Sequence, residues 1–159
     1  MTNIISGEMQ TRIIGLGNRL RGDDAIGPVI VEQLIESGKL SGGVVAMEQG
    51  GDPMVLLDLI SGCRKAVIVD AAEMGCEPGT VRLIRDGDIP AEFHLHTSLH
   101  AIDLQDVLAL ARKMRIATPV SLVAVQIKSC GFSDVLSSQV SESIPEITSI
   151  VLKEAENAA

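Results

Sequence analysis

The most constraining feature of this sequence is an uninterrupted apolar run, Ala66 to Val69, which lies between Lys65 and Asp70. A strand with one face in water alternates apolar and polar residues, whereas this run is apolar at every position. Such a run is typical of a strand that is buried on both faces in the middle of a parallel sheet. It therefore predicts a sheet with helices on both sides.

Shorter apolar runs alternate with segments of helical period along the rest of the chain. Between Ala25 and Gly38, apolar residues recur at helical spacing, and Pro28 fits only near the start of such a helix. We expect strands at 12–16, 44–47, 65–70, 80–84 and 120–127, and helices at 25–38, 53–60, 100–114 and 139–155. This alternation predicts one α/β domain over residues 1–159, with a doubly wound, mostly parallel sheet between two helical layers.

Composition and charge argue against nucleic acid as a partner. The chain has a net charge of -8, no Trp, no Tyr and two Phe residues. Binding to phosphates needs a basic surface, and binding to single strands usually needs aromatic side chains that stack on the bases.

The sequence also argues against secretion and membrane insertion. Its first residues lack the basic start and apolar stretch of a signal peptide, and no run approaches the roughly 18 apolar residues of a membrane span. Cys63, Cys76 and Cys130 are scattered, which is a poor framework for disulfides or a thiolate metal site. We therefore expect a cytoplasmic protein whose cysteines are structural or incidental.

Acids and histidines follow the predicted strands, where function is expected in a fold of this class. Asp23 and Asp24 follow the first strand, Glu48 and Gln49 the second, and Asp70 closes the third. The segment from His94 to His100 follows the fourth strand and enters a helix.

The glycine-rich segment from Gly15 to Asp24 admits several interpretations. A dinucleotide-binding fingerprint would require Gly at the position of Leu20, and a phosphate-binding loop would end in Gly-Lys-Ser/Thr, so both fail. A tight turn with a helix-capping Asp is the simpler interpretation. Because only one of two consecutive acids can be the cap, the pair favours a functional role for the other.

The remaining candidates are interpreted in the same way. Asp70 ends a buried strand, so its carboxylate needs a polar partner, a cation or a capping role. His94 and His96 form either a chance cluster or a metal-binding pair. His100 is predicted in the first turn of a helix capped by Ser98, where a neutral, metal-binding imidazole is favoured. Two carboxylates and an imidazole suit Zn, Ni or Mn and indicate hydrolysis.

The order of motifs resembles that of the nickel-iron hydrogenase maturation endopeptidases. The resemblance spans about residues 12 to 126 and rests on several motifs in the expected order. These are Gly15-Leu16-Gly17-Asn18-x-Leu20-x-x-Asp23-Asp24-x-x-Gly27, Gly50-Gly51, Val69-Asp70-Ala71, Glu77-Pro78-Gly79-Thr80, Ser98-x-His100 and Asp106-Val107-Leu108.

The resemblance implies a doubly wound α/β endopeptidase. Its substrate would be the hydrogenase large-subunit precursor, from which it removes a C-terminal peptide after nickel insertion. The family's metal-contacting residues fall on Asp24, Asp70 and His100. Gln49 stands where many relatives have an acid implicated in cleavage or recognition, with Glu48 and Asp52 beside it as possible substitutes.

Three further expectations concern partners and alternatives. We expect a monomer that is largely metal-free by itself and meets nickel already bound to the precursor. A non-catalytic, nickel-sensing chaperone for the same precursor is the principal alternative. A peptidyl-tRNA hydrolase shares Gly15-Leu16-Gly17-Asn18, but Arg19 replaces its proline and the charge is wrong for tRNA.

Overall fold

The computed structural model of the chain describes residues 9–85, 88, 90, 94–95 and 103–157. In this part, strands form one sheet in the order β2-β1-β3-β6-β4, and the short β5 pairs with the end of β3. The strands are β1 (Thr11–Leu16), β2 (Val44–Gln49), β3 (Lys65–Glu73), β4 (Val81–Arg85), β5 (His94–Leu95) and β6 (Val120–Gln126).

The four strands β2, β1, β3 and β6 are parallel, whereas β4 and β5 run antiparallel to their partners. The prediction of a mostly parallel sheet is therefore confirmed. The central position of β3 follows from its sequence, because every residue from Lys65 to Ala72 is buried.

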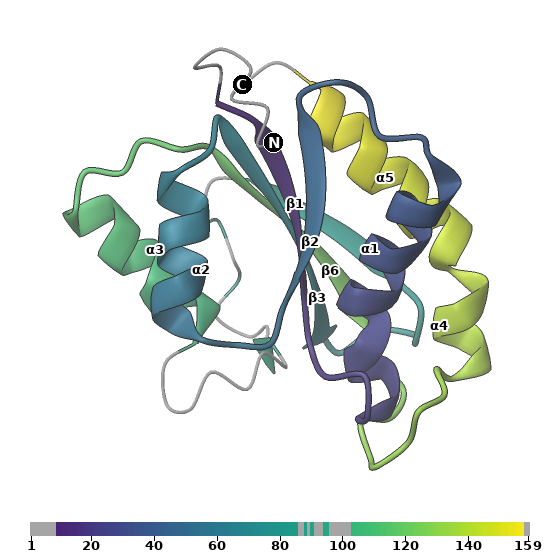
Figure 1. Cartoon of the computed structure of the whole chain (residues 1–159). Helices are drawn as coiled ribbons and strands as arrows, with labels where there is room; N and C mark the ends of the chain where they lie inside the picture. Colours follow the sequence, from purple (N-terminus) through teal and green to yellow (C-terminus); the bar gives the residue numbers. More distant parts are fainter. Residues whose placement is uncertain (1–8, 86–87, 89, 91–93, 96–102, 158–159) are drawn as a thin grey trace.

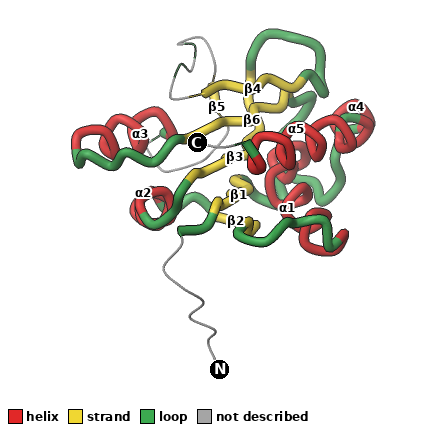
Figure 2. The backbone as a smooth tube through the Cα atoms, turned by 90° about the horizontal axis from the view of Figure 1, so that it is seen from above, coloured by secondary structure: helices red, strands yellow, loops and turns green. Residues whose placement is uncertain are grey.

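Helices cover both faces of the sheet, as predicted (Figure 1). α2 (Pro53–Ser61) and α3 (Leu104–Lys113) lie on one face. α1 (Ile26–Ser37), α4 (Ser138–Glu142) and α5 (Ile144–Glu156) lie on the other, and the sheet separates the two layers (Figure 2). A 3₁₀ turn, η1 (Gly22–Ala25), connects β1 to α1. No helix within these described residues is long and apolar enough to cross a membrane.

Alternating side chains of the strands fill two separate cores. Ile68 and Ala72 of β3 pack in the core beneath α2 and α3, whereas Val67, Val69 and Ala71 pack in the core beneath α1 and α5. Because alternate residues of a strand point to opposite faces, the core in which a residue's neighbours pack shows the face on which that residue lies.

Three of the differences from the predicted boundaries exceed a shift of one or two residues. β3 continues to Glu73, so Asp70 lies within the strand and does not close it. The predicted helix 100–114 begins instead at Leu104, because Asp103 and Asp106 form a capping box. The predicted helix 139–155 is split into α4 and α5 at Ser143, and Pro145 lies in the first turn of α5, where its missing N–H does no harm.

The cysteines agree with their expected minor role. Cys63, Cys76 and Cys130 are free thiols. Cys63 is buried, and this burial raises the pKa of its thiol, so the thiolate is disfavoured.

Candidate active site

Asp24 lies in η1, which follows β1 after a short loop. The turn between them requires Gly17, whose φ is +138°; a Cβ at this position would lie 1.9 Å from the carbonyl oxygen of Asp24. The Asp24 side chain is only 3% exposed, and its Oδ2 accepts a hydrogen bond of 2.9 Å from the backbone N–H of Asn18. The loop thus holds the carboxylate in one place.

A close backbone contact brings this segment against β3. A Cβ on Gly27 would lie 2.3 Å from the carbonyl oxygen of Leu16 and 2.7 Å from that of Val69. Only glycine allows the first turn of α1 to rest on the backbones of β1 and β3 in this way. The adjoining η1 also contacts β3, so Asp24 is carried to the part of the sheet that holds Asp70.

Asp70 is a fully buried carboxylate on the face covered by α2 and α3. Its alternate neighbours on the strand, Ile68 and Ala72, pack in the core on that side, so Asp70 interrupts an otherwise apolar face. Burying a carboxylate is costly unless polar groups or a cation compensate for its lost hydration. Two buried carboxylates at one edge suit a divalent cation of hard to borderline character.

Gln49, at the end of β2, lies on the same face as Asp70. Its alternate neighbour Met47 packs with the core beneath α2 and α3, and Gln49 pairs in register with Leu16. Since β1 lies between β2 and β3, Gln49 and Asp70 are about 10 Å apart across the sheet, two strand spacings. The Gln49 Oε1 accepts a hydrogen bond of 3.2 Å from Gly51 N–H.

The two acids beside Gln49 have other contacts. Glu48 points to the opposite face and pairs with Arg19, which also bridges to Glu32 at 3.0 Å; these hydrogen bonds raise the pKa of the Arg19 guanidinium. Asp52 caps α2, where it accepts from Met54 N–H at 2.9 Å and from Val55 N–H at 3.3 Å. Glu48 and Asp52 are thus engaged in structural contacts. Of the three polar residues Glu48, Gln49 and Asp52, we therefore assign Gln49 to the face that holds Asp70.

The other acid of the pair, Asp23, is also fully buried but serves a different element. Its carboxylate accepts hydrogen bonds from the backbone N–H groups of Lys128 (2.8 Å), Ser129 (3.1 Å) and Ser137 (2.7 Å), and from the Ser137 hydroxyl (2.8 Å). Asp23 thus fastens the loop between β6 and α4 to η1. These partners are more than 100 residues away in sequence, so no local pattern could have revealed them.

The predicted histidines are only partly described. β5 places the backbone of His94 and Leu95 beside Glu73 and Ala72, close to Asp70. His96, Ser98 and His100 lie outside the described residues, and the described ones contain no group of three His, Cys, Asp or Glu side chains able to hold a metal ion. Convergence of Asp24, Asp70 and His100 on one ion therefore stays a prediction.

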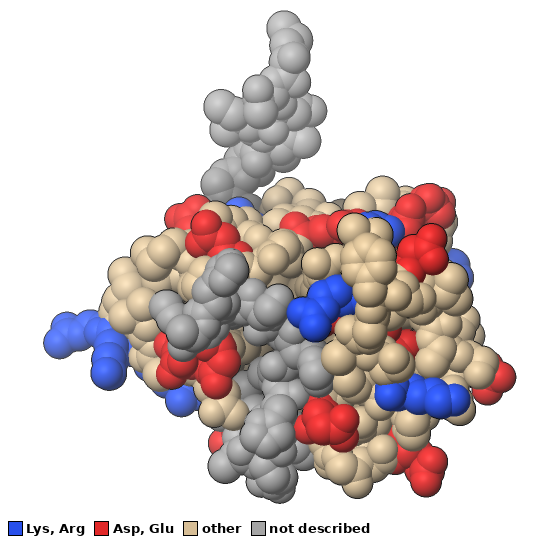
Figure 3. All heavy atoms as spheres, turned by 90° about the horizontal axis from the view of Figure 1, so that it is seen from below, with Lys and Arg blue, Asp and Glu red and all other residues tan. Residues whose placement is uncertain are grey.

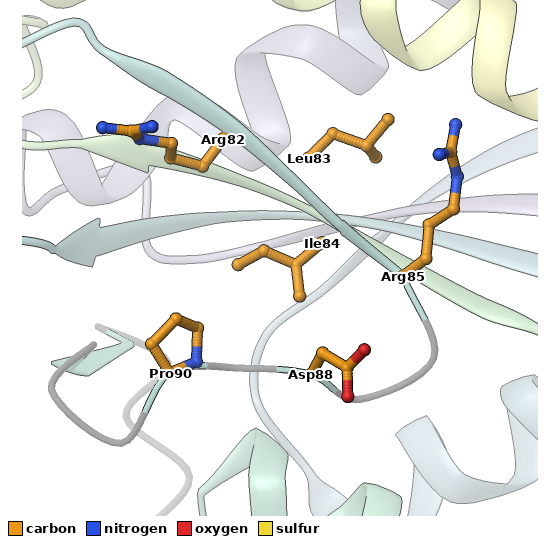
Figure 4. Close-up of a pocket in the computed structure, with 6 residues that line it drawn as sticks. All are labelled: Arg82, Leu83, Ile84, Arg85, Asp88 and Pro90. Carbon is orange, nitrogen blue, oxygen red and sulfur yellow. The ribbon is translucent and has the colours of Figure 1, made fainter.

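A shallow pocket of about 440 Å³ lies along β4 and is distinct from this site (Figure 4). In the close-up, Ile84 points toward Pro90 and Asp88, whereas Leu83 points away from them. β4 is the last strand of the sheet, separated from β3 by β6. The pocket contains none of the predicted site residues.

The carboxyl ends of the parallel strands lie at the lower edge of Figure 1, and Figure 3 shows the molecule from that side. Charged side chains are scattered over this face, with broad uncharged areas between them.

Comparison with known proteins assigns the chain to a family. A model of the family described as "Hydrogenase maturation protease" matches residues 28–154. The chain belongs to this family. Asp70, Gln49 and His100 lie within the matched range, and Asp24 lies just before it.

Relatives within the hydrogenase maturation protease family agree with the assignment. A hydrogenase expression/formation protein HupD of Rhodobacter capsulatus is 33% identical over 103 residues, 64% of this chain and 49% of that protein. The hydrogenase 2 maturation protease of Escherichia coli strain K12 is 35% identical over 105 residues, 65% of this chain and 64% of that protein. The chain spans about half the length of the HupD and HoxM relatives that it matches.

Solved structures of the family share the whole described fold. A hydrogenase maturating endopeptidase HybD from Escherichia coli aligns with a TM-score of 0.77 and 30% identity, covering 92% of this chain and 91% of its own. A [NiFe] hydrogenase maturation protease HybD from Thermococcus kodakarensis aligns with a TM-score of 0.74 and 26% identity, covering 93% of this chain and 100% of its own. The doubly wound fold expected from the sequence is confirmed.

Proposed function

We propose that this protein is a cytoplasmic endopeptidase that removes the C-terminal peptide of a nickel-iron hydrogenase large-subunit precursor after nickel insertion. The observation that carries the proposal is the pair of buried carboxylates, Asp24 and Asp70, at the carboxyl edge of the sheet in a chain of this family. Both carboxylates are withdrawn from water at the strand ends, where a fold of this class places its functional groups, so we assign them to the chemistry of the site.

In this proposal nickel belongs to the substrate. Asp24, Asp70 and His100 complete the coordination of an ion that the precursor already carries, so only a loaded precursor is held in register. His100 follows Leu95 in the sequence. Leu95 pairs with Ala72, which is two residues after Asp70 on β3. Three side chains are few for tight binding of a divalent ion, so the isolated protein is expected to be largely metal-free.

The residues of this edge have separate tasks in peptide-bond hydrolysis. One carboxylate of the acid pair, through an oxygen that does not bind the ion, accepts a proton from the water that attacks the peptide carbonyl, and passes this proton to the leaving amine as the peptide C–N bond breaks. Gln49 lies on the same face and offers a neutral amide for hydrogen bonding to the substrate. Its neutrality avoids adding a third charge beside two carboxylates.

The proposal is tested by the mass of a nickel-loaded precursor before and after incubation with this protein. We expect the precursor to lose its C-terminal peptide, and we expect Asp70→Asn to prevent this loss. A precursor that binds tightly but keeps its full mass would favour the alternative, a nickel-sensing chaperone without catalytic activity.

A further inference from the structure

An exposed aromatic side chain next to the candidate site suggests how the substrate is bound. Phe132 is 91% exposed, in a chain that has only two phenylalanines and no other aromatic residue of the Phe, Trp or Tyr type. Val135, in the same loop, is 66% exposed, and Leu20, in the loop before η1, is 54% exposed. Isolated apolar residues are common on surfaces, but neighbouring ones mark sites of interaction.

These three residues belong to one part of the surface because their backbones are joined. Ser133 N–H donates to the carbonyl oxygen of Leu20 at 3.0 Å, and its own carbonyl accepts from Gly22 N–H at 2.8 Å. Arg21 and Ser133 form a parallel bridge. The β6–α4 loop, residues 128–137, therefore lies against the segment that leads into η1, below the sheet in Figure 1.

The β6–α4 loop is held firmly although its tip is exposed. The buried Asp23 carboxylate accepts four hydrogen bonds from both ends of the loop, at Lys128, Ser129 and Ser137. Within the loop, Ser133 Oγ accepts from Val135 N–H at 3.1 Å. A loop whose backbone is already ordered loses little conformational freedom on binding, which favours an apolar side chain on it as an anchor.

The loop and the site are also connected to each other. Asp23 holds the loop, and the next residue, Asp24, supplies a carboxylate of the candidate site. Any protein bound over Phe132 and Val135 therefore lies beside η1, which holds Asp24. An endopeptidase that cuts one bond of a large folded protein needs such contacts, because a few ligands around one ion bury too little surface for a specific complex.

We propose that the β6–α4 loop is the docking element for the protein substrate, with Phe132 as its anchor and Val135 and Leu20 completing an apolar surface. The occupant is a folded protein that presents apolar side chains next to the peptide bond to be cut. This inference rests on the proposed function, and it adds a binding contribution from apolar burial to that of the shared ion.

The test compares the affinity of the nickel-loaded precursor for the wild-type protein and for Phe132→Ser, measured on the uncleaved precursor. We expect Kd to rise about tenfold or more, as is usual for a central aromatic anchor, while kcat stays within about twofold. Val135→Ser should raise Kd less. Met114→Ser is the matched control, because Met114 is 57% exposed but lies at the far end of α3; its Kd should not change.

Equal affinity of wild-type protein and Phe132→Ser would overturn the inference. So would a wild-type dimer that becomes monomeric in Phe132→Ser without a change in Kd, because the loop would then join two copies of this chain. Failure of the proposed function is recognised separately, since the precursor would keep its full mass with wild-type protein. A precursor that shows no binding at all would contradict both.

Discussion

Two consecutive aspartates perform different tasks in this protein. Asp23 accepts hydrogen bonds from the β6–α4 loop, whereas the Asp24 carboxylate is held by Asn18 N–H at the candidate site. The sequence indicated that only one of the pair could cap a helix, but neither does, since the N-caps are Arg21 for η1 and Ala25 for α1 and neither cap is made by a side chain. The structural role of Asp23 could not be predicted, because its partners are distant in the chain.

Asp23→Asn should weaken the attachment of the loop without removing the site carboxylate. The amide would place an N–H₂ group against donors, leaving buried N–H groups of the loop unsatisfied. We expect the free energy of unfolding to fall by about 1–3 kcal/mol, measured by urea titration. Ser137→Ala, which removes only the hydroxyl donor, should cost less. Equal stability of all three proteins would mean that Asp23 does not fasten the loop.

Gln49 and Glu48 should respond differently to substitution. Glu48 points away from Asp70 toward Arg19, so Glu48→Gln should leave cleavage unchanged, whereas Gln49→Ala should lower it. Gln49→Asp should be tolerated, because the family resemblance of the sequence implies that an acid can occupy this position. The rate of precursor cleavage measures all three. Loss of activity in Glu48→Gln with none in Gln49→Ala would assign the role to Glu48.

For the helices and strands, the spacing of apolar residues predicted the positions of the strands well and the ends of the helices less well. The run from Ala66 to Val69 predicted the central strand because burial on both faces leaves a direct signature. The start of α3 was missed because Asp106 forms the capping box in place of the more usual Glu or Gln. The antiparallel direction of β4 could not be predicted, because the spacing of apolar residues in a strand does not depend on the direction of its neighbour.

The packing of α1 on the sheet depends on Gly27. Gly27→Ala would place a Cβ within 2.3–2.7 Å of two backbone oxygens, and backbone atoms on both sides cannot yield easily. We expect a loss of about 1–3 kcal/mol in the free energy of unfolding, together with loss of cleavage as η1 shifts. Gly42→Ala is the control, since a Cβ there meets nothing within 4 Å. Similar unfolding curves for the two variants would contradict this account.

At the scale of the whole molecule, a buried ion-pair network joins the elements at the edge opposite the site. The Glu154 carboxylate of α5 accepts hydrogen bonds from Lys65 of β3 (3.2 Å), Ser121 of β6 (2.6 Å) and Arg85 of β4 (2.9 and 3.0 Å). No local pattern predicts this network, because its four residues are far apart in the chain and belong to four different elements.

This network should make the fold sensitive to acid. The hydrogen bonds from Arg85, then Ser121 and Lys65, lower the pKa of Glu154 from 4.5 to about 2. A lowered pKa stabilises the folded state above the unfolded value, so this stabilisation should be lost as the pH falls from 4.5 toward 2. Urea titration at a series of pH values measures the slope.

Glu154→Gln provides the control for that slope. Removing one partner of a buried ion pair should cost about 3–5 kcal/mol at neutral pH, because Lys65 is left buried without its counter-charge. The pH dependence between 4.5 and 2 should then become shallower than in wild-type protein. An unchanged slope would show that other carboxylates cause the acid sensitivity.

The central claim is that the carboxyl edge of this sheet recognises nickel carried by the substrate and then cleaves a peptide bond. The most direct test incubates chelator-stripped protein with large-subunit precursor, prepared with and without nickel, and follows the precursor mass. We predict that only the nickel-loaded precursor loses its C-terminal peptide, and that His100→Ala abolishes this loss while the fold remains intact. Equal cleavage of the loaded and nickel-free precursors would contradict the claim.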